Sequence, residues 1–486
     1  MPERSKSYRS LVAALVSALI GLLLSALSLS EPQPVLEIRN ILFDGYQRAA
    51  PRRFDPEMPV RVIDIDDESL EKFGQWPWPR TVLARLVDAI GEQASRVIAL
   101  DILLSEPDRA SPDQLLKMLP ASSERDALEH RLKAANYSND AILAASLAKY
   151  PVVAGMVMAH GATPPPVKAG FAAAGDNPAR FLPKFSGAVA PIPVLQPALK
   201  GLGALNWMPE YDQVVRSIPT LFAAGDRLVP SLAVEALRVA QGASTIIVKS
   251  SNASGETAFG RETGIVSLKV GHIVLPTDAD GTLRPHYAGA RPERRIPAWK
   301  MLEGSVPPGE LSGRIVFVGA SAAALADLRA TPINAVVPGV EVHAEVIEHA
   351  LSGGMLARPD WAQGAEAVVT FLGALLAGLA AYHLLPLVAA FGSLAGLGLL
   401  GYGSWRLFLD GKLLLDPALP GLAVVATFAV ISVARWKTSD AERKAVRTAF
   451  AHYLSPAMVE RLAQSPEALT LGGEQRTMTV LFGDVR

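Results

Sequence analysis

The longest apolar stretches of the chain lie near its start and in its last third. Residues 11–29 contain no charged residue. At about 1.5 Å per residue, a helix of this length crosses a hydrocarbon layer ~30 Å thick. A signal peptide cleaved near Ala26-Leu27-Ser28 is the alternative, but the run exceeds the roughly 7–15 residues of a signal core. We therefore expect a retained membrane anchor.

A second apolar block runs from Ala365 to about Tyr402. One helix of this length would be about twice as long as the hydrocarbon layer is thick, so the block must fold back near His383 to Pro386. A further apolar run follows a short loop at 404–416. The pattern predicts three more spans, at 365–382, 384–403 and 417–434.

Basic residues flank the first and last predicted spans. They are Arg4, Lys6 and Arg9 before the first span, and Arg435, Lys437, Arg443, Lys444 and Arg447 after the last. Basic flanks favour the cytoplasmic side, so residues 1–10 and 435–471 are expected inside and residues 31–360 outside. In a bacterium this predicts a multi-pass protein of the inner (plasma) membrane.

Composition agrees with contact to a lipid bilayer. Charged residues make up 19% of the 486 residues, against about 25% in soluble proteins, and 50% are hydrophobic. Lys plus Arg number 46 and Asp plus Glu 47, so no basic excess exists to bind nucleic acid. The sequence has no cysteine, which excludes disulfides, thiolate metal sites and cysteine nucleophiles.

Residues 31–360 alternate between strand and helix patterns, which predicts an α/β domain. The region 161–197 is rich in Ala, Pro and Gly and is expected to be a long surface connection. Strands are expected at 60–66, 96–104, 152–158, 264–270, 273–276 and 315–319, and helices at 81–90, 120–149 and 342–351.

Two clusters in this domain are candidate ligand positions. Asp64 and Asp66, with Asp67 and Glu68, end the first strand, and their oxygens suit a hard cation; solvated carboxylates or helix caps are the alternative. The second cluster has two aromatic side chains and a cation that form either a hydrophobic plug or a ligand wall: Trp76, Trp78 and Arg80.

Three further motifs have weaker implications. Gly319-Ala320-Ser321 follows a buried strand and offers backbone N–H groups to an anion, although it lacks the Lys of a phosphate-binding loop. His343 has no neighbour at zinc-ligand spacing, which favours a structural role. Gly392 and Gly396 have the spacing of a close helix contact, but small residues are common in membrane helices.

Four segments of the outer region resemble the second family of CHASE sensory domains, which are extracytoplasmic input modules of bacterial membrane receptors. The resemblance covers roughly residues 35–352, and the family commonly has one span before the sensor and three after it. The segments are VRVIDIDDESLEKFGQWPWPR (60–80), VIALDILLSEPD (97–108), GRIVFVGASAAALADLRATPI (313–333) and PGVEVHAEVIEHAL (338–351).

After the last span, residues 435–471 are expected to form a helical linker. Val446, Phe450 and Tyr453-Leu454 fall on one helix face, which either pairs with a second copy in a homodimer or packs on its own domain.

The closing residues, FAHYLSPAMVERLAQSPEALTLGGEQRTMTVLFGDVR, resemble the entry helix and first strand of class III adenylate or guanylate cyclases, which are α+β domains. In that family the aspartate after this strand and the next carbonyl bind magnesium, which implies metal ligands at Asp484 and Val485. Two Mg²⁺ (or Mn²⁺) ions per site assist attack on the α-phosphate of ATP. The resemblance implies that residues 472–486 begin a truncated cyclase domain without its other catalytic residues.

The sequence thus predicts an α/β sensor, four spans and a helical linker into a cyclase that makes cyclic AMP, with an unknown outer stimulus. A sensor histidine kinase with His452 as phosphoacceptor, near Pro456, is one alternative. A non-enzymatic membrane sensor or scaffold is the other.

Overall fold

The computed structural model describes residues 2–135, 137–253, 264–325, 327–450, 477 and 479. The chain divides into two compact units. One comprises Met1–Ser30, Glu366–Leu400 and Pro417–Arg486, and the other comprises Glu31–Ala365 and Gly401–Asp416. We call the first the helical unit and the second the sensor unit.

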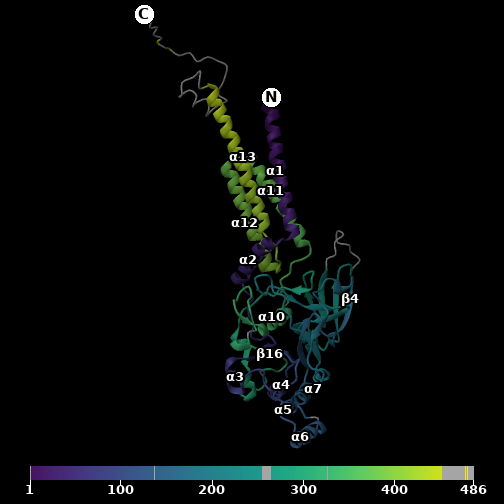
Figure 1. The fold of residues 1–486 in the computed structure, drawn as a ribbon. Coiled ribbons are helices and arrows are strands. Elements are labelled where there is room, and N and C mark those ends of the chain that lie inside the picture. The colour runs from purple at the N-terminus through teal and green to yellow at the C-terminus, as the bar shows by residue number, and fades with distance from the viewer. Residues whose placement is uncertain are drawn as a thin grey trace. The chain divides into compact units, whose positions relative to one another are not determined.

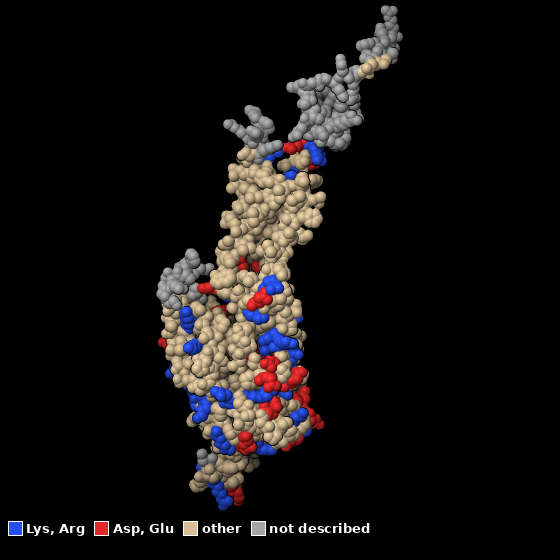
Figure 2. Space-filling model, turned by 180° about the vertical axis from the view of Figure 1, so that it is seen from behind, with Lys and Arg blue, Asp and Glu red and all other residues tan. Residues whose placement is uncertain are grey.

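The helical unit is built from long apolar helices: α1 (Pro2–Ser30), α11 (Trp361–His383), α12 (Pro386–Gly411) and α13 (Ala418–Phe450) (Figure 1). Each described helix is long and apolar enough to cross a membrane, at the positions where the sequence predicts spans. Figure 2 shows that Lys, Arg, Asp and Glu are nearly absent from the face of this unit between its ends. The crossing itself and its direction stay predictions.

Close helix contacts in this unit depend on small residues. A Cβ atom on Gly378 of α11 would lie 1.8 Å from the Ser17 hydroxyl oxygen of α1, so only glycine allows this approach. Gly392 and Gly396 of α12 have no atom within 4 Å of an added Cβ, so the described chain makes no close contact there.

Two helices extend beyond their predicted ends. The predicted loop 404–416 is wrong over its first half, because α12 continues to Gly411. An ion pair of 2.6 Å between Arg406 and Asp410 stabilises this last part. Helix α13 is continuous from the fourth apolar run to Phe450, so the first part of the predicted linker is one helix with that run.

The sensor unit is centred on a mostly parallel sheet, which confirms the α/β expectation. Its strand order is β15-β1-β16-β2-β3-β6, and β7 also pairs with β3. All of these pairs are parallel except β3 with β6. The strands are β1 (Val60–Ile65), β2 (Val97–Leu103), β3 (Val152–Ala159), β6 (Gly187–Val189), β7 (Gly201–Ala204), β15 (Arg295–Pro297) and β16 (Ile315–Ala320).

Helices cover both faces of this sheet. Alternate residues of β1 face opposite cores: Val60 and Val62 pack with α8 and α10, and Ile63 and Ile65 with α4, α7 and α9. The result is three layers around two apolar cores. The bounds are α3 (Asp67–Phe73), α4 (Arg80–Glu92), α7 (Asn139–Lys149), α8 (Leu232–Ala240), α9 (Ala298–Leu302) and α10 (Gly339–Ser352).

Two predicted segments of the sensor are wrong in part. The helix expected at 120–149 is two helices, α6 (Ser123–Ala134) and α7, and the Ser138 hydroxyl caps the second by accepting from Ala141 N–H. The expected connection 161–197 contains β4 (Gly170–Ala174) and β5 (Lys184–Phe185) besides β6. The alanine-rich β4 has no apolar alternation, because it is a largely exposed edge strand paired with β11.

The remaining elements form smaller layers around the central sheet. Helix α2 (Gln33–Ala49), which follows α1, is absent from the predicted elements. A second sheet has the order β13-β12-β11-β4, and a third β10-β9-β5. The bounds are α5 (Pro112–Lys117), β8 (Ile218–Pro219), β9 (Leu221–Ala224), β10 (Arg227–Pro230), β11 (Thr245–Ser250), β12 (Ile265–Val270), β13 (Ile273–Pro276), β14 (Thr282–Leu283), β17 (Leu328–Arg329) and β18 (Val337–Pro338).

Candidate functional site

Helix α10 carries three buried carboxylates on one face. Glu341, Glu345 and Glu348 are spaced i, i+4 and i+7, so their side chains lie above one another along the helix. They are 2%, 3% and 0% exposed. Glutamates are almost never buried to this degree without partners.

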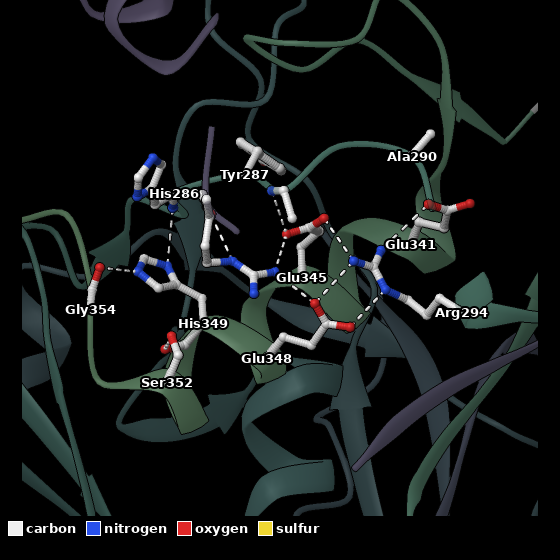
Figure 3. Close-up of polar contacts among 12 residues, drawn as sticks. His286, Tyr287, Ala290, Arg294, Glu341, Glu345, Glu348, His349, Ser352 and Gly354 are labelled. Atoms are coloured by element: carbon white, nitrogen blue, oxygen red, sulfur yellow. Dashed lines mark hydrogen bonds and ion pairs between the residues drawn. The ribbon is translucent and has the colours of Figure 1, made fainter. Parts of the chain in front are cut away.

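Two arginines from distant parts of the sequence supply these partners (Figure 3). Arg294, which is fully buried, places Nε 2.8 Å from Glu348 and Nη2 2.9 Å from Glu345. Its Nη1 lies 3.5 Å from Glu341. Nη2 of Arg52 lies 2.8 Å from Glu345 and 2.6 Å from Glu348. We call these five residues the buried ion network.

Burial and ion pairing act in opposite directions on the pKa values of Arg294 and Glu341. Burial lowers the pKa of Arg294, but the negative charges of Glu345 and Glu348 outweigh it and raise that pKa above its ordinary value. At the end of the network, burial raises the pKa of Glu341 above its ordinary value, against the pull of Arg294 and Arg295. The charges therefore depend on one another for their stability.

Two neutral histidines extend the network toward the end of α10. The backbone N–H of His286 donates to His349 Nδ1 at 3.1 Å, so Nε2 of His349 carries the proton that it donates to the Gly354 carbonyl at 2.7 Å. Burial lowers the pKa of His349 to about 4, which agrees with this neutral form. His286 in turn donates from Nε2 to the Ala50 carbonyl at 2.8 Å.

These contacts join two chain segments that lead to different apolar helices. Arg52 follows α2, the helix next after α1, and its Nε donates to the His286 carbonyl at 3.1 Å. Gln47 of α2 accepts from Tyr287 N–H at 3.0 Å. Gly354, whose carbonyl accepts the hydrogen bond from His349, lies a few residues before α11. The buried ion network therefore connects the segment that follows α1 with the segment that precedes α11.

A third segment packs next to these residues: residues 401–416, which comprise the last part of α12 and the loop that leads to α13. The Phe408 ring lies 5.3 Å from the His286 ring and 5.5 Å from the Tyr46 ring. Phe43, Leu356 and Leu414 complete this small apolar core. The segments that adjoin all four long apolar helices thus meet in one part of the sensor unit.

A second polar group lies at the carboxyl ends of the central strands. Asp64 of β1 is aligned with Gly319 of β16, and Asp101 follows the aligned position on β2. Arg295 contacts Asp64 at 3.5 Å and Glu341 at 3.0 Å, which connects this group to the buried ion network. Burial raises the pKa of Asp64 above its ordinary value.

The structure separates the acidic residues that the sequence groups together. Asp64 is buried, whereas Asp66 caps α3 by accepting from Ser69 N–H at 2.9 Å. The Asp67 carboxylate accepts from Ala323 N–H at 3.2 Å. Among the described residues no group of three or more His, Asp or Glu side chains is arranged to hold a metal ion. The cap alternative is therefore the one seen for Asp66.

Trp76, Trp78 and Arg80 lie on the opposite side of the sheet from Asp64. Trp78 is 1% exposed in the core with Ile63 and α4, and its Nε1 donates to the Gly74 carbonyl at 2.8 Å. The Arg80 backbone N–H donates to Asp108 at 2.8 Å, and its Nε lies 3.5 Å from Asp140. These contacts match the packing alternative for this motif.

The remaining candidates of the outer domain have internal partners or packing roles. The N–H groups of Ser321 and Ala322 donate to the Ile65 carbonyl at 3.3 and 3.2 Å, so the anion site expected there is not formed by them. The His343 ring lies 4.5 Å from the Trp207 ring and 6.0 Å from that of Phe317. Burial lowers its pKa to about 3.

The inner candidates Asp484, Val485 and His452 lie outside the described residues, so their roles stay predictions. Sequence reasoning missed the buried ion network. Its signal was the regular spacing of Glu341, Glu345 and Glu348 in a helix with few other charges. Nothing in the sequence paired that face with Arg52 or Arg294.

Comparison with known proteins identifies the family of the chain. A family model described as the CHASE2 domain matches residues 14–380, most of the 486 residues. No match was found among curated proteins or among solved structures. The match includes α1 from residue 14 onward, the whole central sheet, α10 and nearly all of α11. The chain therefore belongs to the CHASE2 domain family.

Proposed function

We propose that this protein is a four-span membrane receptor whose CHASE2 sensor regulates a class III cyclase that converts ATP to cyclic AMP. In this proposal residues 31–360 are outside a bacterial inner membrane and both ends are cytoplasmic. The protein acts as a homodimer and holds two Mg²⁺ or Mn²⁺ ions per active site. The stimulus is an extracytoplasmic signal.

One observation supports the receptor part of the proposal. The segments that adjoin all four apolar helices meet at the buried ion network and at the apolar core around Phe408. A change in the sensor that moves α10 must therefore alter contacts next to every span. Packed interiors have discrete arrangements, so such a change is transmitted as a shift of whole elements.

The output part of the proposal rests on the sequence alone. Residues 450–486 resemble the start of a class III cyclase, and α13 leads toward them without a break as far as Phe450. Asp484 and the Val485 carbonyl are the proposed metal ligands. The cations that these groups would hold would supply Lewis-acid assistance to attack on the α-phosphate of ATP.

The test is an assay of the purified protein with its complete inner domain, incubated with ATP and Mg²⁺. We expect cyclic AMP and pyrophosphate in equal amounts, with no product when Mg²⁺ is chelated. Transfer of the γ-phosphoryl group to His452 would instead support a histidine kinase. Neither product would indicate a non-enzymatic sensor or scaffold and would contradict the cyclase.

A further inference from the structure

We propose that the carboxyl group of Asp101 is a proton-binding site through which the sensor responds to the acidity of its surroundings. The site is formed by the sensor unit itself. Only the compartment whose acidity it reports, and the output that follows, rest on the proposed function.

The position of Asp101 follows from side-chain alternation along β2, one residue beyond the last residue of β2 that is aligned with β16. β1, β16 and β2 are adjacent and parallel, with Asp64 opposite Gly319 and Leu100 opposite Val318. Alternation along the strands places Asp64, Gly319 and Asp101 on the face that packs against α8 and α10, because Ala99 and Phe317 lie in that core. A Cβ on Gly319 would lie 2.5 Å from Val340 Cβ, so α10 packs directly on this row.

Among the described residues Asp101 forms no ion pair, which distinguishes it from Asp64 and Glu341, although each of these also has one buried oxygen without a hydrogen bond. Its Oδ2 is shielded from solvent and accepts no hydrogen bond from any described residue. Asp64 and Glu341, by contrast, share the guanidinium of Arg295. A carboxylate oxygen buried without a donor is costly, and protonation lowers that cost because it removes the charge.

Charged groups on the neighbouring elements act on Asp101 in both directions. Asp327 and Arg329, in the segment before α10, pair at 2.7 Å, and Glu235 and Arg238 of α8 also pair at 2.7 Å. His343 of α10 is neutral at ordinary pH. Burial, and to a smaller extent the charge of Asp327, raise the pKa of Asp101 to about 7 against the opposing charge of Arg329.

Ionisation of Asp101 therefore acts on α10. The new negative charge repels Asp327, whose backbone carbonyl accepts from the N–H of Gly339, the first residue of α10, at 2.8 Å. The same helix carries the three glutamates of the buried ion network. Loss of the proton thus weakens the packing of α10, the helix that leads toward α11.

The sign of the pH effect on stability follows from the raised pKa. An unfolded chain gives Asp a pKa near 3.9, so the folded sensor holds a proton that the unfolded chain releases. The contribution of the Asp101 proton to the free energy of unfolding is complete below about pH 4 and is lost as the pH rises to about 7. Within that window the unfolding equilibrium constant rises by up to about tenfold per pH unit from this group.

The test compares the full chain in detergent with its Asp101→Asn variant and with Asp126→Asn as a control on an exposed helix. Urea unfolding of the sensor is followed by tryptophan fluorescence between pH 5 and 8.5. We expect the free energy of unfolding of Asp101→Asn to depend on pH less steeply than that of the wild type, by the equivalent of about one bound proton. The Asp126→Asn control should follow the wild type. Amide hydrogen exchange of residues 339–352, corrected for intrinsic rates, should rise with pH in the wild type and not in Asp101→Asn.

Infrared spectroscopy gives a second measurement that does not depend on stability. At pH 6 the wild type should show a protonated carboxyl band that Asp101→Asn lacks. If the wild type lacks that band, the proton site is refuted. It is also refuted if the stability of Asp101→Asn depends on pH in the same way as that of the wild type. These measurements need no cyclase activity, so a failed cyclase assay would leave them unaffected.

Discussion

Replacement of Arg294 by methionine is expected to destabilise the sensor by about 3–5 kcal/mol, because removing one partner leaves buried charges uncompensated. Arg294 has no exposed surface and contacts Glu341, Glu345 and Glu348. Methionine fills much of the same volume, so the lost stability reflects the lost charge pairing more than a cavity. Urea unfolding of the sensor at pH 7 measures the change in its free energy of unfolding.

Two comparisons separate this effect from a general cost of losing an arginine. Arg125 pairs with an exposed partner, Asp126, so Arg125→Met should change stability by less than about 1 kcal/mol. Adding Glu348→Gln to Arg294→Met should recover part of the loss, because it removes one of the buried negative charges that Arg294 offset, while Arg52 stays paired with Glu345. An Arg294→Met variant as stable as the Arg125→Met control would contradict the network's role.

The largest functional effect is expected at Asp484. In the protein with its complete inner domain, Asp484→Asn should lower cyclic AMP production on the order of a thousandfold, since a lost metal ligand costs several kcal/mol of transition-state stabilisation. Asparagine keeps the shape of the side chain but removes the charge that offsets the cations. Expression and folding should be unchanged.

The measurement is cyclic AMP formation by both proteins at matched concentration, with Mg²⁺ titrated in each. Raising Mg²⁺ should restore part of the activity if the ligand is the cause. Near-normal activity of the variant at low Mg²⁺ would contradict a metal-binding role for Asp484.

Much of the fold could be predicted because it depends on local patterns. The central strands and α4 are found near their expected positions, since alternation and helical periodicity report burial directly. The four apolar helices are equally clear from their length. Helix α2 was missed because its buried face mixes Val35 and Phe43 with Arg39, Asp44 and Gln47, so it shows no clean apolar stripe.

The candidate site was harder to predict because it depends on long-range pairing. Asp64 was singled out as part of an acidic run, yet its partner is Arg295 and its nearest acidic neighbour in the run, Asp66, caps a helix. Arg52 meets α10 from almost three hundred residues away. Such pairs follow from the order of strands in the sheet, which one sequence does not reveal.

The central claim is that the sensor and the inner end of α13 lie on opposite sides of a membrane. The sequence contains no cysteine, so a single introduced cysteine is a unique label. Met118 is 81% exposed in the sensor, and the Lys444 side chain is 75% exposed on α13. Both positions tolerate substitution because neither side chain is buried.

Intact cells carrying Met118→Cys or Lys444→Cys should be treated with a maleimide that cannot cross membranes. We expect Met118→Cys to be labelled at once, and Lys444→Cys to be labelled only after the membrane is permeabilised. Labelling of Lys444→Cys in intact cells, or protection of Met118→Cys, would contradict this topology.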